Sequence, residues 1–446
     1  MSGSRGRTGR WATWALAATA VACTPPSPDR PPLVLLTVEG LRADTAESAL
    51  PRTAATFSGS GACRATAIAA SSATAPALAS LLTGLNPWRH RVLLDRQSLS
   101  EEFRTLAEAL QSAGYATQGF QEASTVATAR KGFAQGFDRW AHLREGQGAA
   151  IALRALAPGD FVWVHLVAAA NGYRVAPEEA ASANLDPSWA RRARRGFRRS
   201  VLQQASDHGR MTPELAALAR AAYRHTLGPV DQKLARLLGA LAESNSAGQA
   251  TVILVGVQGE PLGSDGQWQR GRDLQRDSIE VPLWTRSPEA VRTGCTDSAI
   301  PPSARRVFAR LLERAGQEPP PGVAAARSPA SLESFSELYR LDGFNRFAWV
   351  TDDHLFHWRT RLDPVGAEAR RLGRRRERPY RSLFPLTAPL SGGSIIGSAV
   401  PWTPAGGDSA AATRPATQDE LARFKAVFLW FVDRERAPQD EVAEVP

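Results

Sequence analysis

The sequence predicts an α/β fold in which helices flank a central, mostly parallel sheet. Continuous apolar runs at 33–38, 161–167 and 251–257 are expected of strands that are buried on both faces of a sheet. Helical patterns at 98–113 and 215–241 lie between these runs. Strands that alternate with helices are typical of a parallel sheet covered on its faces. The chain has 446 residues and is 43% hydrophobic, which suits one large domain with additions.

The ends of the helices can be predicted from capping residues. Ser98 can cap the first long helix, Glu101 stands three residues later as in a capping box, and Gly114 ends the apolar face. Residues 79–85 indicate the start of another helix. In the second long helix we expect Pro229 to kink or divide the element, because proline lacks the amide hydrogen that a helix interior needs.

The character of the sequence changes after residue 330. Two short apolar runs, 347–350 and 355–358, are typical of paired strands and predict a small C-terminal subdomain at 331–385. Residues 386–416 are rich in Gly, Ser, Ala and Pro and are predicted to be a flexible linker. A capping box then begins an amphipathic pattern, so we expect 417–446 to be a terminal amphipathic helix and tail, packed on the body of the protein.

The N-terminus has the pattern of an export signal. Arginines precede an apolar stretch at 11–22, which at about 12 residues is too short to cross a bilayer core of about 30 Å. We therefore predict a signal peptide at 1–22. The small residues before Cys23 are similar to the lipobox of bacterial lipoproteins, in which the cysteine carries the lipid. We expect a lipid-anchored protein of the bacterial cell envelope, periplasmic or at the cell surface, with a Pro-rich tether at 23–31.

The three cysteines fit an exported protein. Once Cys23 carries a lipid, Cys63 and Cys295 remain. In an oxidising compartment these two thiols could form a disulfide, or they could stay separate and buried. Three cysteines exclude both a disulfide-rich miniprotein and a zinc site made of four thiolates.

The positive charge of the chain comes almost entirely from arginine. The formal net charge is +10, and two arginine-rich runs lie at 191–199 and 370–378. We interpret both runs as solvated loops or helix faces, with contact to an anionic membrane or polymer surface as the alternative. Neither run contains aromatic residues at the density that base stacking needs, and the chain carries an export signal, so we expect no nucleic-acid partner.

Several segments, in one order, resemble the sulfatase branch of the alkaline phosphatase superfamily. Residues 33–44 read LVLLTVEGLRAD and residues 74–90 read TAPALASLLTGLNPWRH, where the family has C/S-x-P-S-R-A-S-L-L-T-G-L-x-P-x-R-H. Further matches lie at 105–117, 163–166 and 230–263. The resemblance covers about residues 32 to 360 and implies a sulfatase-like α/β domain at 32–330, with a sandwich of helices around a mostly parallel sheet.

The resemblance also implies a chemistry. Sulfatases and their relatives hydrolyse sulfate or phosphate esters with a nucleophile at the N-terminus of the helix that carries A-S-L-L-T-G, where amide groups favour an anion. A divalent cation, calcium in typical sulfatases, activates the nucleophile and polarises the ester. Such a cation takes several carboxylate oxygens as ligands, which the family supplies after the first and a late strand.

The positions that would hold and attack the ester depart from the family pattern. Thr74 stands at the nucleophile position, where sulfatases have Cys or Ser, so the formylglycine found in sulfatases cannot form. Ala77 and Leu78 replace the Ser and Arg that follow. A leucine side chain cannot help to hold an anion, so the anion site is degenerate as well.

The expected metal ligands are also reduced. Glu39 is the one carboxylate at the end of the first strand, because Gly40 stands where a second Asp often follows. Val257 and Gln258 replace a late Asp–His or Asp–Asn pair, and Asp265 replaces a His. A divalent cation held by so few carboxylates is poorly compensated in a partly buried site.

The positions that determine the fold match the family, whereas the positions for catalysis and metal binding depart from it. Two functions are compatible with this pattern. The first is a catalytically degenerate pseudo-sulfatase that needs no cofactor and acts as a binding or accessory protein, with an anionic ligand or a protein partner. The alternative is an active, metal-dependent hydrolase or phosphotransferase of sulfuric or phosphoric esters. It would use Thr74 as nucleophile and calcium held by Glu39, Gln258 and Asp265.

The lipid anchor gives a first testable prediction. The Cys23→Ser variant, expressed in a bacterium with lipoprotein processing, should lose its acyl chains and leave the membrane fraction, because the lipidated thiol is absent. Mass spectrometry of the mature N-terminus and fractionation measure this. Cys295→Ser serves as the control and should remain membrane-bound; an unlipidated wild-type N-terminus would contradict the prediction.

Overall fold

The structure is a computed structural model. It describes residues 30–288 apart from 123, 125, 144–146, 169–171 and 184, then 301–320, and beyond these the segments 335–338, 344–350, 354–361, 396–401, 414–415, 417–419 and 422. The predicted signal peptide, nearly all of the tether and most of the terminal helix therefore lie outside the described residues. None of the helices that the structure does describe has the length and apolar character needed to cross a bilayer.

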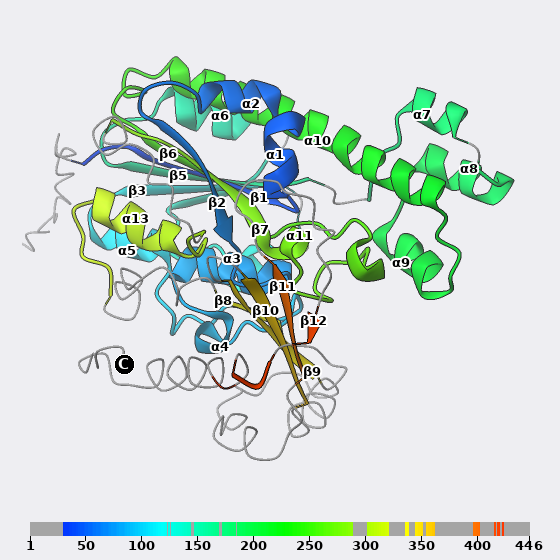
Figure 1. Cartoon of the computed structure of the whole chain (residues 1–446). Coiled ribbons are helices and arrows are strands. Elements are labelled where there is room, and N and C mark those ends of the chain that lie inside the picture. Colours follow the sequence, from blue (N-terminus) through cyan, green and yellow to red (C-terminus); the bar gives the residue numbers. More distant parts are fainter. Residues whose placement is uncertain are drawn as a thin grey trace, which may run out of the picture.

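A seven-stranded, mostly parallel sheet forms the centre of the protein (Figure 1), as the sequence predicts. Its strand order is β2-β7-β6-β1-β5-β3-β4. β1 lies between β5 and β6 and is parallel to both, β3 is parallel to β5 and β4, and β7 runs antiparallel to β6 and β2. The bounds are β1 Leu33–Glu39, β2 Ala62–Ile68, β3 Ala116–Gln121, β4 Arg139–His142, β5 Asp160–Val167, β6 Thr251–Gly256 and β7 Glu280–Arg286.

Helices cover both faces of this sheet, because alternate side chains of its buried strands point to opposite faces. Val34, Leu36 and Val38 of β1 pack into one core cluster, and Leu33 and Leu35 pack into the other. Figure 1 shows α2, α6 and α10 along one face and α3, α5 and α13 along the other. These helices are α2 Pro51–Thr56, α3 Thr74–Thr83, α5 Leu106–Ser112, α6 Gln147–Arg154, α10 Pro213–Ala242 and α13 Arg306–Arg314.

Shorter helices connect and extend these layers. They are α1 Ala43–Ala49, α4 Pro87–His90, α7 Pro177–Ser182, α8 Pro187–Arg195, α9 Arg199–Asp207 and α11 Arg276–Ile279, with single 3₁₀ turns at η1 Ala129–Lys131 and η2 Ser264–Gly266. The first arginine-rich run thus lies on α8 and on the residues that lead into α9. The second run, at 370–378, lies outside the described residues.

Two helix predictions differ from the structure. The helix predicted at 98–113 begins only after Thr105, whose hydroxyl accepts from the amide of Glu108 while the Glu108 carboxylate accepts from the amide of Thr105. Leu99, in the residues before this cap, donates its amide to Lys131 O instead. Of the two outcomes predicted for Pro229, a kink or a division, the structure contradicts division, because Pro229 lies inside one continuous helix, α10.

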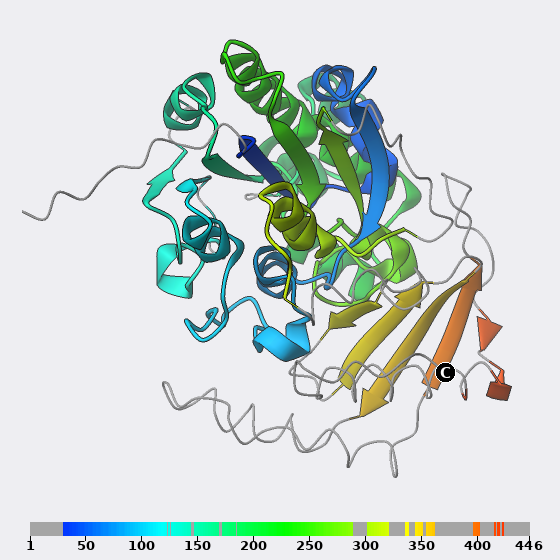
Figure 2. The same cartoon turned by 90° about the vertical axis from the view of Figure 1, so that its left-hand side faces the viewer.

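A second, five-stranded antiparallel sheet follows in the chain (Figure 2), in the order β12-β11-β10-β9-β8. The strands predicted at 347–350 and 355–358 pair within β9 and β10. The bounds are β8 Phe335–Leu338, β9 Phe344–Val350, β10 His354–Arg361, β11 Ile396–Pro401 and β12 Arg414–Pro415. β11 and β12 fall within 386–416, the segment whose composition predicts a linker. Their main chains pair with neighbouring strands, and their composition gives no strand signal.

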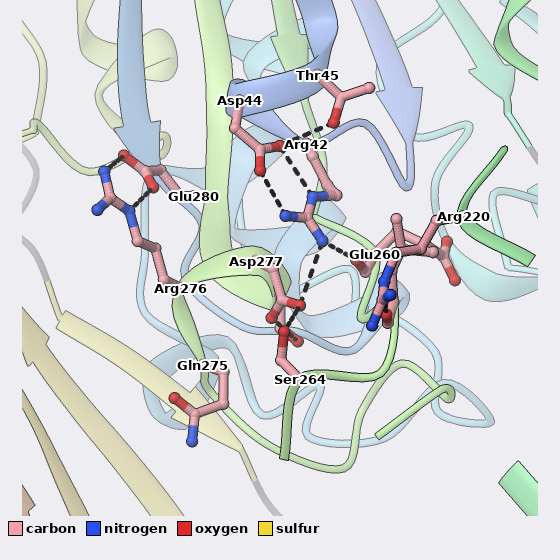
Figure 3. A network of polar contacts seen from close by, with 12 residues as sticks. Arg42, Asp44, Thr45, Arg220, Glu260, Ser264, Gln275, Arg276, Asp277 and Glu280 are labelled. Atoms are coloured by element: carbon pink, nitrogen blue, oxygen red, sulfur yellow. Dashed lines mark hydrogen bonds and ion pairs between the residues drawn. The ribbon is translucent and has the colours of Figure 1, made fainter. Parts of the chain in front are cut away.

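A polar network fixes the loops at the end of the central sheet (Figure 3). Arg42, after β1, donates to Asp44 Oδ1 at 2.9 Å and to Asp277 Oδ2 at 3.3 Å. It also donates to the carbonyl oxygen of Glu260 at 3.3 Å. Ser264 Oγ donates to the same Asp277 oxygen at 2.6 Å. The residues after β1, after β6 and in α11 are thereby held in one arrangement.

Asp273, just before α11, is the least well compensated acid near this network. Its Oδ1 accepts from Ser278 Oγ at 2.7 Å and from the Gln275 amide at 3.3 Å. Its Oδ2 is shielded from solvent and accepts no hydrogen bond among the described residues. Burial, and then the neighbouring Asp277 carboxylate, raises the pKa of Asp273 to about 6.

This pKa predicts a pH-dependent effect of Asp273→Asn. The folded protein holds the Asp273 proton up to about pH 6, whereas the unfolded chain releases it near pH 3.8, so folding stability falls as pH rises between these values. Because the residue is partly exposed, we expect Asn to raise the free energy of unfolding at pH 7.5 by about 1 to 2 kcal/mol. The gain at pH 4 should be smaller. Urea titrations at both pH values measure this, and an equal effect at both would contradict it.

Candidate functional site

The predicted nucleophile lies at the carboxyl end of the central strands. Thr74 is the first residue of α3, and Gln258 follows β6 in the loop beside it. The Gln258 amide Nε2 donates to Thr74 Oγ1 at 2.6 Å, and both side chains are buried. The structure therefore brings Thr74 and Gln258 together. Thr74 Oγ1 is the acceptor in this hydrogen bond. The Gln258 amide is not a base, so this contact does not activate the Thr74 hydroxyl as a nucleophile.

Glu39, the last residue of β1, is buried beside this pair. Its Oε1 accepts from Ser124 Oγ and from His165 Nε2, both at 2.9 Å. The other ring nitrogen of His165 lies 2.9 Å from Thr37 Oγ1, which accepts from Trp163 at 2.9 Å. Burial alone would raise the pKa of Glu39, but His165 and the guanidinium of Arg270 hold it below its usual value. Glu39 is therefore anionic at neutral pH.

A second buried carboxylate, Glu260, lies across from Glu39. Tyr173 Oη donates to Glu260 Oε1 at 2.6 Å, and Arg199 Nε donates to the same oxygen at 2.5 Å. Arg270 Nε donates to Glu260 Oε2 at 2.5 Å, and Arg270 Nη1 lies 3.6 Å from Glu39 Oε2. Burial opposes ionisation of Glu260, yet the charges of Arg199 and Arg270 hold its pKa below the usual range. Arg270 thus bridges the two buried glutamates.

The N-terminus of α3 is occupied by an internal carboxylate. Asp95 Oδ1 accepts from the backbone amide of Ala75 at 2.8 Å. This amide belongs to the first turn of the helix, where the resemblance places the ester anion. Burial, and next the nearby Glu39 charge, raises the pKa of Asp95, although the Ala75 amide opposes this.

The structure does not bring Asp265 into the predicted cation site. Asp265 is exposed on η2, accepts a hydrogen bond from Gln275 and does not line the cavity that contains Glu39. Its backbone has a φ of 47°, a conformation that residues other than glycine rarely adopt. Around Glu39 the structure places a guanidinium, and no group of three or more His, Cys, Asp or Glu in the described residues is arranged to hold a metal ion. The donor set does not fit calcium.

A cavity of about 1090 Å³ opens over these residues. Its inner wall includes Glu39, Thr74 and Asp95. Another part of its lining is basic and exposed, and comes from α8 and the residue before α9: Arg192, Arg195 and Arg198. Arg199, the first residue of α9, and Arg270 also line the cavity and pair with the buried glutamates. The first arginine-rich run, at 191–199, therefore lines the same cavity as Thr74. Neither the run nor the family motif around Thr74 predicts this proximity.

Sequence reasoning missed Asp95, Glu260 and Arg270. Glu260 stands two residues after Gln258, so its place on the same loop was a usable signal. Asp95 and Arg270 lie in irregular segments with no motif spacing, and only the fold brings them to Glu39. Cys63 is disulfide-bonded, whereas Cys295 and Cys23 lie outside the described residues, so the pairing of Cys63 with Cys295 stays a prediction.

Comparisons with known proteins agree with this fold. The sulfatase family model matches residues 33–150. A 2-O GAG sulfatase is similar in structure, with a TM-score of 0.62 at 12% identity over 91% of this chain and 93% of that one. A phosphonate monoester hydrolase of Agrobacterium radiobacter has a TM-score of 0.52 at 17% identity, over 74% and 87% of the two chains.

Another similar structure is a protein in complex with its substrate D-glucosamine-2-N,6-O-disulfate, with a TM-score of 0.57 at 14% identity over 74% of this chain and 88% of that one. No curated protein matches the sequence. The predicted resemblance is confirmed: residues 33–150 have the sequence pattern of the sulfatase family, and the chain has the sulfatase fold.

Proposed function

We propose that this chain is an exported, lipid-anchored, sulfatase-like protein that binds an anionic ligand in its cleft without hydrolysing it. The observation that carries the proposal is the basic wall of the cavity formed by Arg192, Arg195 and Arg198. All three are exposed, and no carboxylate of the described residues forms an ion pair with them. Arg192 lies over the ring of Trp189, at 5.6 Å from its centroid. Guanidinium groups that line a cavity without a carboxylate partner favour sulfate, phosphate or carboxylate groups of a ligand.

The opposite wall supports binding rather than turnover. Thr74 Oγ1 accepts a hydrogen bond from the Gln258 amide, which cannot remove a proton. The helix amide at Ala75 already donates to Asp95, so an ester oxygen would have to displace a carboxylate to reach it. Glu39 and Glu260 are compensated by arginines. The groups that would hold, attack and activate an ester are therefore engaged with one another.

The geometry also limits where the ligand lies. Glu39 and Asp95 line the cavity, and the arginine beside Glu39, Arg270, is already paired with Glu39 and Glu260. The exposed arginines lie on α8 and in the residues after it. An anionic ligand should therefore bind at the arginine side and leave the inner part of the cleft to water. Contacts of this kind weaken with salt, because exposed charges are screened.

Two double variants on one helix test this proposal. Arg192→Ala/Arg195→Ala removes two cavity arginines, and Arg191→Ala/Arg194→Ala removes two arginines of α8 that do not line the cavity. Each charge-assisted contact contributes about 1.5 kcal/mol, so the cavity variant should bind roughly tenfold more weakly if one of its arginines contacts the ligand and more than about a hundredfold more weakly if both do. The matched variant has the same net charge and should retain most of the wild-type affinity.

Binding can be measured by calorimetry with inorganic sulfate, inorganic phosphate and a heparin oligosaccharide as probes, each at two salt concentrations. An equal loss of affinity in both variants would mean that binding depends only on the net charge of α8, which would contradict the proposed site. Turnover of aryl sulfate or phosphate esters that disappears both in Thr74→Ala and in chelator would instead establish the metal-dependent hydrolase that the sequence left as the alternative.

A further inference from the structure

Arg270 occupies the space between the two buried glutamates of the cleft. Its Nε and Nη2 face Glu260 Oε2, with the Nε distance 2.5 Å, and its Nη1 lies 3.6 Å from Glu39 Oε2. Only 11% of its side chain is exposed, and Glu260 is fully buried. A guanidinium shielded to this degree is a fixed part of the interior and differs from the solvated arginines of α8.

Gly40 makes room for this guanidinium. Its φ is +68°, a conformation that side chains rarely adopt. A Cβ atom at this position would lie 1.8 Å from Arg270 Nη2 and 2.7 Å from Glu260 Oε2. A side chain at position 40 and the guanidinium of Arg270 therefore exclude each other. The sulfatase resemblance places a second carboxylate at this position. In this chain Gly40 carries no charge, and the positive guanidinium of Arg270 lies in the space beside it.

The charge of Arg270 acts on all the acids of the inner cleft. It favours the ionised forms of Glu39 and Glu260, whose pKa values lie below the usual range although burial opposes this. It acts in the same direction on Asp95, where burial and the charge of Glu39 still leave the pKa raised. Buried carboxylates without a counter-charge cost several kcal/mol each, so three acids close together need a cation. Arg199 supplies a second positive charge to Glu260. Among the described residues, Arg270 alone forms ion pairs with both Glu39 and Glu260.

We propose that Arg270 is the resident cation of the cleft and takes the place that a divalent metal ion has in a sulfatase-like fold. The guanidinium neutralises Glu39 and Glu260 and holds the loops that carry them, so the protein folds with these acids ionised and without metal. This is a positioning role for Arg270. It does not depend on anion binding by the α8 arginines, because different side chains carry the two proposals.

Removal of the guanidinium should convert the pair of acids into a cation site. Wild-type protein should melt at the same temperature in chelator and in millimolar Ca²⁺, Mg²⁺ or Mn²⁺. Arg270→Ala should melt at least about 5 °C lower in chelator, because two buried carboxylates then face each other. The same variant should regain stability with a divalent cation, which binds the folded state alone.

Two further variants keep the test decisive. Arg272→Ala removes a nearby arginine that lies 3.8 Å from the exposed Asp207, and it should behave as wild type. Glu39→Gln/Arg270→Ala removes one charge of each sign and should melt higher than Arg270→Ala in chelator. If Arg270→Ala does not fold without metal, recovery of folded protein from this double variant makes the same comparison.

Several results would overturn the inference. A rise in the melting temperature of wild-type protein with a divalent cation would show that a metal still occupies the cleft. Equal melting temperatures of Arg270→Ala and wild type in chelator would show that the acids need no cation. A double variant no more stable than Arg270→Ala would show that Arg270 does not act on Glu39. Loss of anion binding in the α8 variants leaves each of these readouts unchanged.

Discussion

The buried ion cluster of Glu39, Arg270 and Glu260 is the constraint on which the rest of the cleft depends. Glu39 ends β1 and Glu260 lies in the loop after β6, so one guanidinium joins the ends of two adjacent parallel strands. Buried charges of this kind are costly to separate and leave little freedom in the surrounding loops. The Arg42 network on the other side of Glu260 fixes the same loop through its carbonyl oxygen.

The acids of the cleft are compensated by arginines, and the groups around Thr74 are engaged with one another, which supports the proposed binding function. The first amide of α3 donates to Asp95, and the Thr74 oxygen accepts from Gln258. The positive charge that remains available lies on the opposite wall, where α8 contributes arginines that have no carboxylate partner among the described residues. The α8 arginines that would attract an anion are thus different side chains from those around Thr74, which supports the proposal that the cleft binds an anion.

The sequence predicted the central sheet well because strands buried on both faces must be apolar throughout, as 33–38, 161–167 and 251–257 are. It predicted the start of α5 wrongly because Ser98 and Thr105 both begin capping-box patterns, and only tertiary contacts decide between them. β11 was missed because its small residues gain their stability from main-chain pairing with β10.

The candidate site was only partly predictable for a related reason. Thr74, Glu39 and Gln258 could be found because they stand at positions of a family motif. Arg270 follows the last matched segment, 230–263, in an irregular stretch with no motif spacing, so no sequence pattern indicates its place beside Glu39. Asp265 was predicted from its sequence position, yet its turn directs it toward Gln275. Charge compensation in a cleft is a property of three-dimensional proximity, and spacing along the chain does not encode it.

The affinity of the wild-type protein for sulfate and for a heparin oligosaccharide, measured in chelator and again in millimolar Ca²⁺, tests the central claim most directly. If the protein's own guanidinium groups both complete the cleft and bind the anion, the dissociation constants in the two conditions should agree. Binding that is lost in chelator and restored by Ca²⁺ would contradict this account, because a metal ion would then supply the charge assigned here to arginine.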